Sequence, residues 1–502
     1  MRLHSAIVSG LTVLALASGC RVAAPTEPKA SVALPAAFAT TPQGPSAVAA
    51  TTAGGALPTT PPADTLSAGA LPWRQFFADP ALAALIDTAL QQNLDLRIAV
   101  QRVEMARANY LARRGALLPT VSAVGSAGAD RYGRYTLNGV GNFDTNLSPN
   151  IEGGQRIPGP LTPDFFVGLR SSWEIDVWGK LKSRRKAAYL RVLSSEQGRN
   201  FVTTNVVAEV ARLYYELLTY DNQLAVLQRN VGLQQKALGV MRIQKQAGRA
   251  TELAVQQFEA QALRTESLSY ETRQRITETE AAINQLLGRY PQPIARGAAL
   301  PQQTLPARLG AGLPSASLLR RPDVRQAELD LQAARADVDA ARAAFLPSLT
   351  LTPYVGFNAF RSNMLFDPSS LAFGAIAGLA GPILNRSQLK ADQRTAVAAN
   401  LETYYLYQKT LQTGFREVVT GLKGLENYRS AAALRQQEVD LLTKGVATAN
   451  DLYVAGYASY LEVITAQRSV LEAELSLAEA RQAQLLQSVN LYRALGGGWQ
   501  QP

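Results

Sequence analysis

The chain has 502 residues, of which 47% are apolar and 18% charged, a balance that provides a folded core and argues against general disorder. Its 50 basic and 39 acidic residues give a net charge of +11, which permits binding to nucleic acid or to anionic lipid. The single cysteine, Cys20, excludes an intrachain disulfide, and with His4 as the only histidine the rest of the chain lacks an imidazole for general base catalysis or for zinc or haem ligation.

The N-terminus has the pattern of an export signal. Arg2 precedes an apolar run over residues 6–17 that is too short to span a bilayer. The segment Leu16-Ala17-Ser18-Gly19-Cys20 resembles a bacterial lipobox, with Ala17 where leucine is usual. Arg21 rather than aspartate follows the cysteine, which by the same resemblance favours the outer membrane. We therefore expect residues 1–19 to be a lipoprotein signal peptide and Cys20 to carry a covalent lipid. A plain signal peptide with an incidental cysteine is the alternative.

Residues 20–70 have a different composition from the rest of the chain. They are rich in Ala, Pro, Thr and Ser, they contain Glu27 and Asp64 as their only acidic residues, and their apolar residues show no helical or strand period. This composition is typical of an extended tether between an anchor and a folded domain.

Proline is absent from two long windows, residues 164–290 and 383–501. Chain length alone suggests about three domains of about 150 residues, but windows of this length without proline predict long uninterrupted helices. Apolar residues in both windows recur at alternating steps of three and four, which is coiled-coil periodicity. The helix expected over residues 180–246 would extend roughly 100 Å.

The two windows are copies of one another. An offset of 228 carries the segment around Asn93 onto that around Arg321, and an offset of 208 carries Leu287-Gly288 onto Leu495-Gly496. The chain is therefore predicted to be a tandem duplication, with a first repeat over residues 71–300 and a second over 301–499. The first copy has a longer loop, rich in Gly, Asn and Pro, over residues 138–163.

Each copy also contains two candidate strands, over residues 121–132 and 165–177 in the first and 349–360 and 371–383 in the second. Their alternation and their length of about ten residues fit tilted membrane-spanning strands, although such runs are also common in soluble sheets. Four strands cannot close a barrel, and an open sheet edge is forbidden in lipid. Three copies would supply twelve strands, so the pattern predicts oligomerisation.

Several motifs occur in the order found in one known family. They are the segment from Trp73 to Pro80, the stretch 85–96, Ser172-Trp173-Glu174-Ile175-Asp176-Val177-Trp178-Gly179-Lys180, and the terminal Ala494-Leu495-Gly496-Gly497-Gly498-Trp499. Together they resemble the TolC-like outer-membrane efflux proteins, and in particular the lipoprotein branch of the NodT and OprM type. The resemblance spans about residues 71–499.

The resemblance implies an α+β membrane protein. Its fold would be a trimeric channel-tunnel in which a twelve-stranded β-barrel, four strands from each chain, continues into a long α-helical periplasmic barrel. The implied partners are two further copies of the chain, a periplasmic adaptor, an inner-membrane RND transporter and outer-membrane lipid.

The hairpin tips are the first candidate sites. Ala247-Gly248-Arg249 and Ala455-Gly456-Tyr457 occupy equivalent places between two long helices, where glycine permits the turn. In the resembling family such tips lie at the periplasmic end and contact the adaptor. A purely structural role as turn residues is the alternative.

The second candidate site follows the second tip. Residues 460–468 match the stretch that lines the family's closed gate, so the resemblance implies that Leu461 is an apolar constriction and Arg468 a polar latch. Thr465 stands where the family commonly has aspartate, which puts inherited cation binding at the gate in doubt. Glu462 precedes Thr465 by three residues and faces about 60° away on a helix. An ordinary coiled-coil core position is the alternative for Leu461.

Two further patterns have simpler explanations. Glu174 and Asp176 are two residues apart at a strand end and suggest a carboxylate pair, for which solvation of the strand end is the simpler account. The basic run over residues 180–186 lacks the interleaved aromatics of a nucleic-acid site, so anionic headgroups or plain solvation are expected.

We therefore expect a passive exit duct of the outer membrane with a long periplasmic extension, which is not an enzyme and has no cofactor or metal beyond the lipid on Cys20. The chain also lacks a phosphate-binding GxxxxGK[ST] loop, so energy would come from the transporter. The alternatives are the exit duct of a type I protein secretion system, a periplasmic coiled-coil scaffold without a channel, and, more distantly, a carboxylate-based hydrolase.

Overall fold

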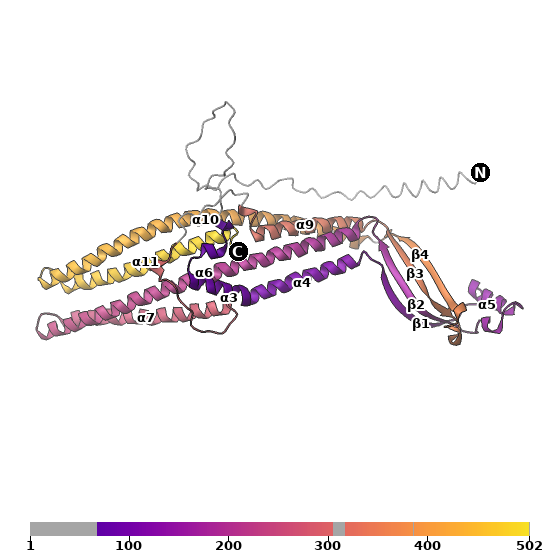
Figure 1. The fold of residues 1–502 in the computed structure, drawn as a ribbon, viewed down its shortest axis with the longest axis horizontal. Helices are drawn as coiled ribbons and strands as arrows, with labels where there is room; N and C mark the ends of the chain where they lie inside the picture. Colours follow the sequence, from indigo (N-terminus) through magenta and orange to yellow (C-terminus); the bar gives the residue numbers. More distant parts are fainter. Residues whose placement is uncertain (1–67, 305–316, 385, 501–502) are drawn as a thin grey trace, which may run out of the picture. The chain divides into compact units, whose positions relative to one another are not determined.

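The computed structural model describes residues 68–304, 317–384 and 386–500 (Figure 1). Within these ranges the chain divides into two compact units. The first unit comprises residues 105–192 and 330–404, and the second comprises 68–104, 193–329 and 405–500. Each unit thus draws on both halves of the sequence. The expected signal peptide, Cys20 and nearly all of the expected tether lie outside the described residues.

The first unit contains one antiparallel sheet. Its strands β1 (Thr120–Asp130), β2 (Thr162–Ile175), β3 (Ser348–Ala359) and β4 (Leu371–Ala380) are hydrogen-bonded in the order β1-β2-β3-β4. All four predicted strands are found, although β2 begins three residues before the predicted start and β4 ends three before the predicted end. β1 and β4 are the edge strands of the sheet.

The register of the sheet separates an apolar face from a polar one. Because residues directly opposite one another point the same way, Val355 shares its face with Leu169 of β2 and Phe373 of β4. The same face carries Val121, Phe165, Val167, Trp173, Leu349, Leu351, Phe357, Leu371 and Leu379. The other face carries mainly polar or small side chains, among them Thr120, Ser122, Asp164, Arg170, Ser172, Thr350, Thr352 and Asn358. A charge-free apolar face opposite a polar one is the pattern of a strand that has lipid on one side.

Long helices make up the rest of the described chain. The two longest are α6 (Lys180–Gln246) and α10 (Ser387–Val454), which are followed by α7 (Glu252–Leu286) and α11 (Tyr460–Ala494). The bounds predicted for the first long helix, residues 180–246, are confirmed. The shorter helices are α2 (Trp73–Phe76), α3 (Pro80–Gln92), α4 (Leu94–Gly115), α5 (Leu137–Leu147) and α9 (Pro322–Ala343), with 3-10 turns η2 (Ala68–Ala70), η3 (Gly153–Gln155), η4 (Leu300–Gln302), η5 (Ser362–Met364) and η6 (Pro368–Ser370).

Helix α5 corrects the predicted loop. Residues 138–163 were expected to be irregular because they are rich in glycine and asparagine, yet α5 occupies 137–147. The hydroxyl of Thr136 accepts a hydrogen bond from the amide of Gly139 and so caps its first turn. None of the helices in the described ranges is long and apolar enough to cross a membrane.

The core of the second unit lies where α3, α6, α7 and α11 meet. The coiled-coil stripe predicted for α6 is buried at Val206, Val210 and Leu217. A neighbouring stripe that includes Tyr214 and Leu218 is buried as well. Helix α6 therefore buries a broader face than the single seam of a two-stranded coiled coil, because several elements pack around it.

The predicted duplication is visible in the element bounds. Shifting α4 by 228 residues reproduces both ends of α9, and shifting α7 by 208 residues reproduces both ends of α11. The left-handed glycines repeat in the same way, with φ +66° at Gly288 and φ +81° at Gly496. The two halves of the chain thus build the same set of elements twice.

The end of each helical hairpin is bonded to the residue directly before α4 in the first copy and before α9 in the second. In the first copy the side-chain amide of Asn93 donates to the carbonyl of Leu286, at 2.8 Å. In the second copy the guanidinium of Arg321 donates to the carbonyl of Ala494, at 2.9 Å. The donors are equivalent at the offset of 228 and the acceptors at the offset of 208. We call these two bonds the hairpin locks.

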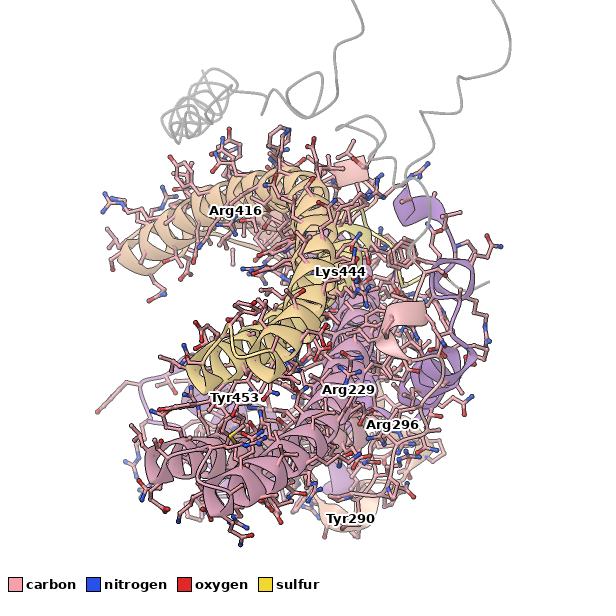
Figure 2. The ribbon with its side chains drawn as sticks, turned by 90° about the vertical axis from the view of Figure 1, so that its left-hand side faces the viewer. Arg229, Tyr290, Arg296, Arg416, Lys444 and Tyr453 are labelled. Atoms are coloured by element: carbon pink, nitrogen blue, oxygen red, sulfur yellow. The ribbon has the colours of Figure 1, made fainter. Side chains whose placement is uncertain are left out.

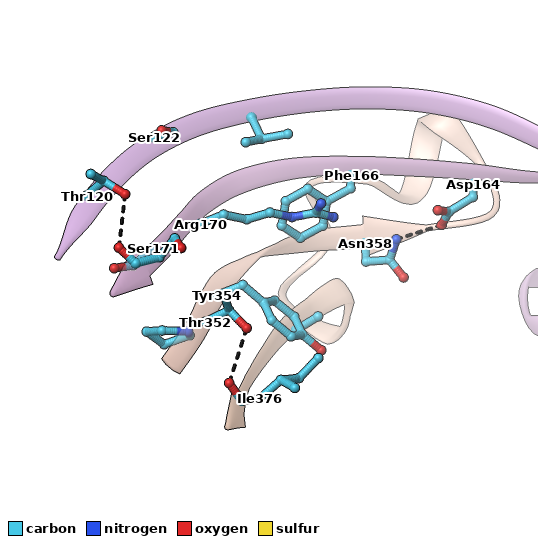
Figure 3. Close-up of a pocket in the computed structure, with 14 residues that line it drawn as sticks. Thr120, Ser122, Asp164, Phe166, Arg170, Ser171, Thr352, Tyr354, Asn358 and Ile376 are labelled. Atoms are coloured by element: carbon cyan, nitrogen blue, oxygen red, sulfur yellow. Dashed lines mark hydrogen bonds between the residues drawn. The ribbon is translucent and has the colours of Figure 1, made fainter. Parts of the chain in front are cut away.

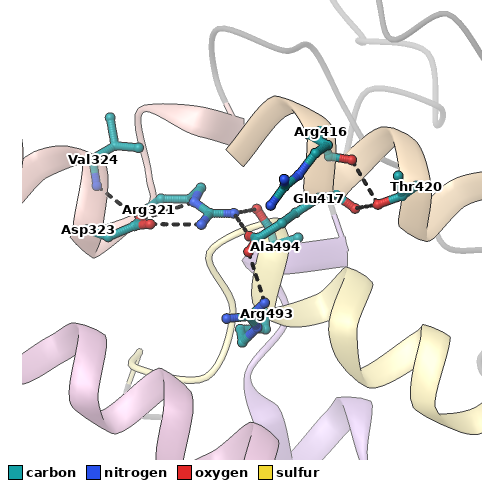
Figure 4. A network of polar contacts seen from close by, with 8 residues as sticks. All are labelled: Arg321, Asp323, Val324, Arg416, Glu417, Thr420, Arg493 and Ala494. Atoms are coloured by element: carbon teal, nitrogen blue, oxygen red, sulfur yellow. Dashed lines mark hydrogen bonds and ion pairs between the residues drawn. The ribbon is translucent and has the colours of Figure 1, made fainter. Parts of the chain in front are cut away.

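The second hairpin lock contains additional charges. Arg321 forms ion pairs of 2.8 Å with both Asp323 and Glu417, and Arg493 approaches the other oxygen of Glu417 at 3.1 Å (Figure 4). Arg321 is 4% exposed, and burial of a charge of this kind requires such partners.

Candidate functional site

The first predicted tip is the turn between α6 and α7. Gly248 adopts φ +72°, a conformation that glycine takes without steric cost. The amide of Arg249 donates to the carbonyl of Gln244 at 2.8 Å, which closes the end of α6. The hydroxyl of Thr251 then caps the start of α7.

The second tip, between α10 and α11, has the same design. Gly456 adopts φ +82°, and the amide of Tyr457 donates to the carbonyl of Leu452 at 2.8 Å. Ser459 and Glu462 form a capping box at the start of α11. Hydrogen bonds from the hydroxyl and the amide of Ser459 hold the pKa of the Glu462 carboxyl below its usual range. Both predicted tips are therefore turns.

The two hairpins contact each other close to their tips. The hydroxyl of Tyr453, on α10, donates to the side-chain carbonyl of Gln244, on α6, and Figure 2 shows Tyr453 beside the hairpin of α6 and α7. An apolar cluster that includes Met241, Phe258 and Val463 packs the same region. Farther along the hairpins, Arg229 of α6 pairs with Glu474 of α11 at 2.5 Å.

The three predicted gate residues line one hollow in the second unit. Leu461, Thr465 and Arg468 lie on α11, and the hollow between this helix and α7 has a volume of about 320 Å³. Its other lining residues are Gln257, Ala260, Gln261, Arg264 and Ile464. Leu461 is 55% exposed, so it is not a core position within the described chain, where Val463 is the buried neighbour.

The charge in this hollow is basic. Arg264 and Arg468 both line it, and its lining residues include no carboxylate. The nearest partner of Arg468 is Glu472, with Nε and Oε1 3.8 Å apart on one exposed helix face. Glu462 is not among the lining residues, and its carboxylate accepts hydrogen bonds from the amide and the hydroxyl of Ser459. Sequence reasoning found Arg468 and missed Arg264, which only the pairing of α7 with α11 brings to the hollow.

The polar face of the sheet carries a larger concave site, of about 700 Å³. It lies in the first unit and is lined by Thr120, Ser122, Val124, Asp164, Phe166, Arg170, Ser171, Ser172, Thr352, Pro353, Tyr354, Asn358, Ala372 and Ile376 (Figure 3). Arg170 was not singled out from the sequence. The alternation of the strand predicted its face, but an isolated charge is recognised only once the neighbouring strands are in register.

The two carboxylates at the end of β2 have structural partners. Asp176 accepts hydrogen bonds from the amides of Leu181 and Lys182, at 3.0 and 2.8 Å, and so caps the start of α6. Glu174 forms an ion pair of 2.5 Å with Lys180. The two side chains are therefore engaged separately, as expected for a strand end.

Comparison with known proteins agrees with this architecture. The family model described as outer membrane efflux protein matches residues 85–289 and 313–497. The solvent efflux pump outer membrane protein SrpC of Pseudomonas putida is 32% identical over 85% of this chain and 87% of its own length. The cation efflux system protein CusC of Escherichia coli is 30% identical over 86% of this chain and 88% of its own length.

Solved structures show the same fold. The open-state MtrE outer membrane channel of Neisseria gonorrhoeae superposes with a TM-score of 0.76, is 27% identical, and covers 88% of this chain and 94% of its own. The predicted fold class is thus confirmed: an α+β membrane protein with the duplicated chain fold of the trimeric channel-tunnels. The predicted place in the outer membrane is confirmed as well. The chain belongs to the outer membrane efflux protein family and is the outer-membrane channel component of a tripartite efflux system.

Proposed function

We propose that three copies of this chain close one twelve-stranded barrel, through which substrates pass passively to the exterior. The observation that carries the proposal is the sheet itself, which has an apolar and a polar face and ends in two edge strands, β1 and β4. In lipid the free backbone groups of both edges need partners, and a second copy supplies them if its β4 pairs with β1 of the first.

Disulfide crosslinking tests this closure. A series of double variants with one cysteine in β1 and one in β4 is expected to give reducible dimers and trimers after oxidation in the membrane. The matched control places the cysteines at Val167 of β2 and Leu351 of β3, which are interior strands of the sheet, and is expected to stay monomeric. The trimer would be contradicted if the control gave as much crosslinked dimer and trimer as the β1–β4 variants. It would also be contradicted if the β1–β4 variants gave none.

The proposed partners are a periplasmic adaptor and an inner-membrane RND transporter, met at the hairpin tips. Exposed apolar side chains support a protein contact there, since Tyr457 is 85% and Val454 86% exposed. The chain then needs no catalytic group of its own. Crosslinking from a photoreactive residue at 457, with the first tip at Arg249 as a second position, is expected to capture an adaptor.

We further propose that Leu461, Thr465 and Arg468 form the periplasmic gate. Leu461→Ser or Arg468→Ala is expected to raise single-channel conductance in planar bilayers, because each removes a side chain from the constriction. Leu253→Ser is the matched control, since Leu253 is the equivalent position of the first copy and is also 55% exposed. Unchanged conductance in both gate variants would refute the assignment.

The proposed cargo is drugs or other small toxic compounds. Relatives are described as efflux proteins for solvents, toluene, cations and antibiotics. Deletion of the gene is expected to increase susceptibility to such compounds. Loss of a secreted protein without any change in susceptibility would favour the type I secretion duct, and purified protein without conductance would favour the scaffold.

We also propose that Cys20 carries the lipid and that the two repeats span residues 71–300 and 301–499. Mass spectrometry of the membrane protein is expected to find acyl chains on a chain that begins at residue 20. Cys20→Ser is expected to abolish the modification and leave an unprocessed or soluble product.

A further inference from the structure

Arg170 occupies the middle of the polar sheet face. It lies on β2 directly opposite Tyr354 of β3, and it lines the concave site of about 700 Å³. In Figure 3 its side chain extends along the sheet toward the ring of Phe166. The guanidinium carbon lies 4.7 Å from the centre of that ring, within the range of a cation–π interaction.

The ring under Arg170 is itself held in place. Phe166 is 4% exposed and packs edge-on against Tyr354, with ring centres 6.2 Å apart. It lies over the paired glycines Gly168 and Gly356, where an added Cβ would come within 3.0 and 2.9 Å of its ring. An added Cβ would come closer still to the facing strand, 2.4 Å from the carbonyl oxygen of Val355 at Gly168 and 2.6 Å from that of Val167 at Gly356. The two glycines therefore permit both the close strand pairing and the position of the ring. Arg170 is therefore supported by packing and is positioned better than a freely mobile surface arginine.

No opposite charge neutralises Arg170 among the described residues, none of which forms an ion pair with it. Asp164 is the nearest acidic residue on the polar face toward the start of β2, and its carboxylate accepts from Asn358 at 2.7 Å. Toward the other end, Glu174 is paired with Lys180. At about 3.3 Å per residue, the backbone positions of these acids lie roughly 20 Å and 13 Å from that of Arg170 along the strand. Both carboxylates are engaged by other side chains, and neither forms an ion pair with the guanidinium.

We propose that Arg170 makes the pore prefer anionic over cationic solutes. The inference rests on the trimeric barrel proposed above, in which the polar sheet face lines the lumen. Three copies would then place three fixed guanidinium groups at one level of the pore. A ring of arginines favours anions and disfavours cations. The remaining polar-face positions of β1, β3 and β4 beside Arg170 are uncharged: Ser122, Val124, Thr352, Tyr354, Gly374 and Ile376.

The test is the reversal potential of the purified, full-length channel in a planar bilayer with a tenfold KCl gradient. We expect the wild-type channel to favour chloride, and Arg170→Gln to lower the chloride-to-potassium permeability ratio at least threefold. Arg170→Lys keeps the charge and is expected to stay near the wild-type ratio. Benzoate as the only anion tests whether an aromatic carboxylate also permeates in preference to potassium.

Arg185→Gln is the charge control, since it removes an exposed arginine from α6 and is expected to leave the ratio unchanged. A potassium-selective wild-type channel, or equal ratios for wild type and Arg170→Gln, would overturn the inference. Failure of the proposed function is distinguishable, because it would appear as no conductance in any variant. Heat-modifiable migration on gels verifies that Arg170→Gln still assembles.

Discussion

The guanidinium of Arg321 lies 2.8 Å from the carboxylate of Glu417, with the arginine almost wholly buried. This pair belongs to the second hairpin lock, where the same side chain also holds the carbonyl that ends α11. Removing one partner of a buried ion pair leaves the other as an uncompensated buried charge. The loss of folding stability is therefore larger than the net stabilisation that the intact pair contributes.

Arg321→Met is therefore expected to destabilise the protein by about 3–5 kcal/mol. Thermal unfolding in detergent measures the effect, with Arg325→Met as the control, because that arginine is half exposed and pairs with Glu328 on its own helix. The control is expected to cost at most about 1 kcal/mol. A similar loss in both variants would show that the buried network has no special role.

Gly288 is predicted to be the less replaceable of two left-handed glycines. It has φ +66°, and a Cβ there would lie 2.5 Å from the carbonyl oxygen of Gln92. Gly456 has φ +82° but open space around it. Gly456→Ala is expected to cost about 1–2 kcal/mol from backbone strain alone. Gly288→Ala is expected to cost more, because the backbone of Gln92 must also move. Chemical denaturation in detergent ranks the two variants, and equal losses would contradict the steric account.

The two faces of the sheet are predicted to respond differently to a charge. Val355→Arg places a guanidinium on the apolar face and is expected to reduce folding into lipid vesicles by about 2–4 kcal/mol if it lies near the bilayer midplane. Thr352→Arg, three residues earlier on the polar face of the same strand, is expected to be tolerated. Urea titration of folding into vesicles measures the folding free energy of both variants. If Thr352→Arg were the more destabilised, the face assigned to lipid would be the wrong one.

Alkaline pH is predicted to destabilise the second unit. Burial raises the pKa of the phenols of Tyr214, Tyr215 and Tyr492 above the usual value near 10. The unfolded chain therefore releases these protons at lower pH than the folded chain. The stabilisation is complete below about pH 10 and is lost as the pH rises, by up to about 1.4 kcal/mol per pH unit for each tyrosine.

Tyr492→Phe isolates one of these contributions. The ring stacking on Phe76, with centres 4.1 Å apart, is retained, while the ionisable hydroxyl is removed. Melting temperatures between pH 9 and 11 are expected to fall less steeply in this variant. Tyr290→Phe is the control, because Tyr290 is 93% exposed, and its profile is expected to match the wild type. A Tyr492→Phe profile as steep as the wild type would argue against the burial effect.

Much of the fold could be predicted from periodicity, because helices this long repeat the same pattern many times. The absence of proline predicted α6 and α10, the equivalent long helices of the two copies. The sequence offset of 208 predicted that α11 would match α7. The sequence predicted secondary structure less well where the residue composition disfavoured a helix and a capping residue favoured one. Helix α5 contains two glycines and three asparagines, and only its cap at Thr136 favours the helix.

The sites were less predictable than the fold, since they depend on which elements become neighbours. The turns at Gly248 and Gly456 follow from local sequence and could be anticipated. The second arginine of the gate hollow, Arg264, comes from another helix more than 200 residues away from Arg468 in the sequence. Arg170 is isolated because the neighbouring strands place no acidic residue beside it. The sequence of one strand alone does not show this.

The hairpin locks show what divergence after duplication preserved. In the first copy the donor is the neutral side-chain amide of Asn93, and in the second it is the charged guanidinium of Arg321. The acceptor in both is the backbone carbonyl of the last helical residue of the hairpin. The retained feature is the bond rather than the residue that makes it. A ring of three such chains would alternate neutral and charged donors, so its six hairpins would fall into two classes and its symmetry would be threefold, never sixfold.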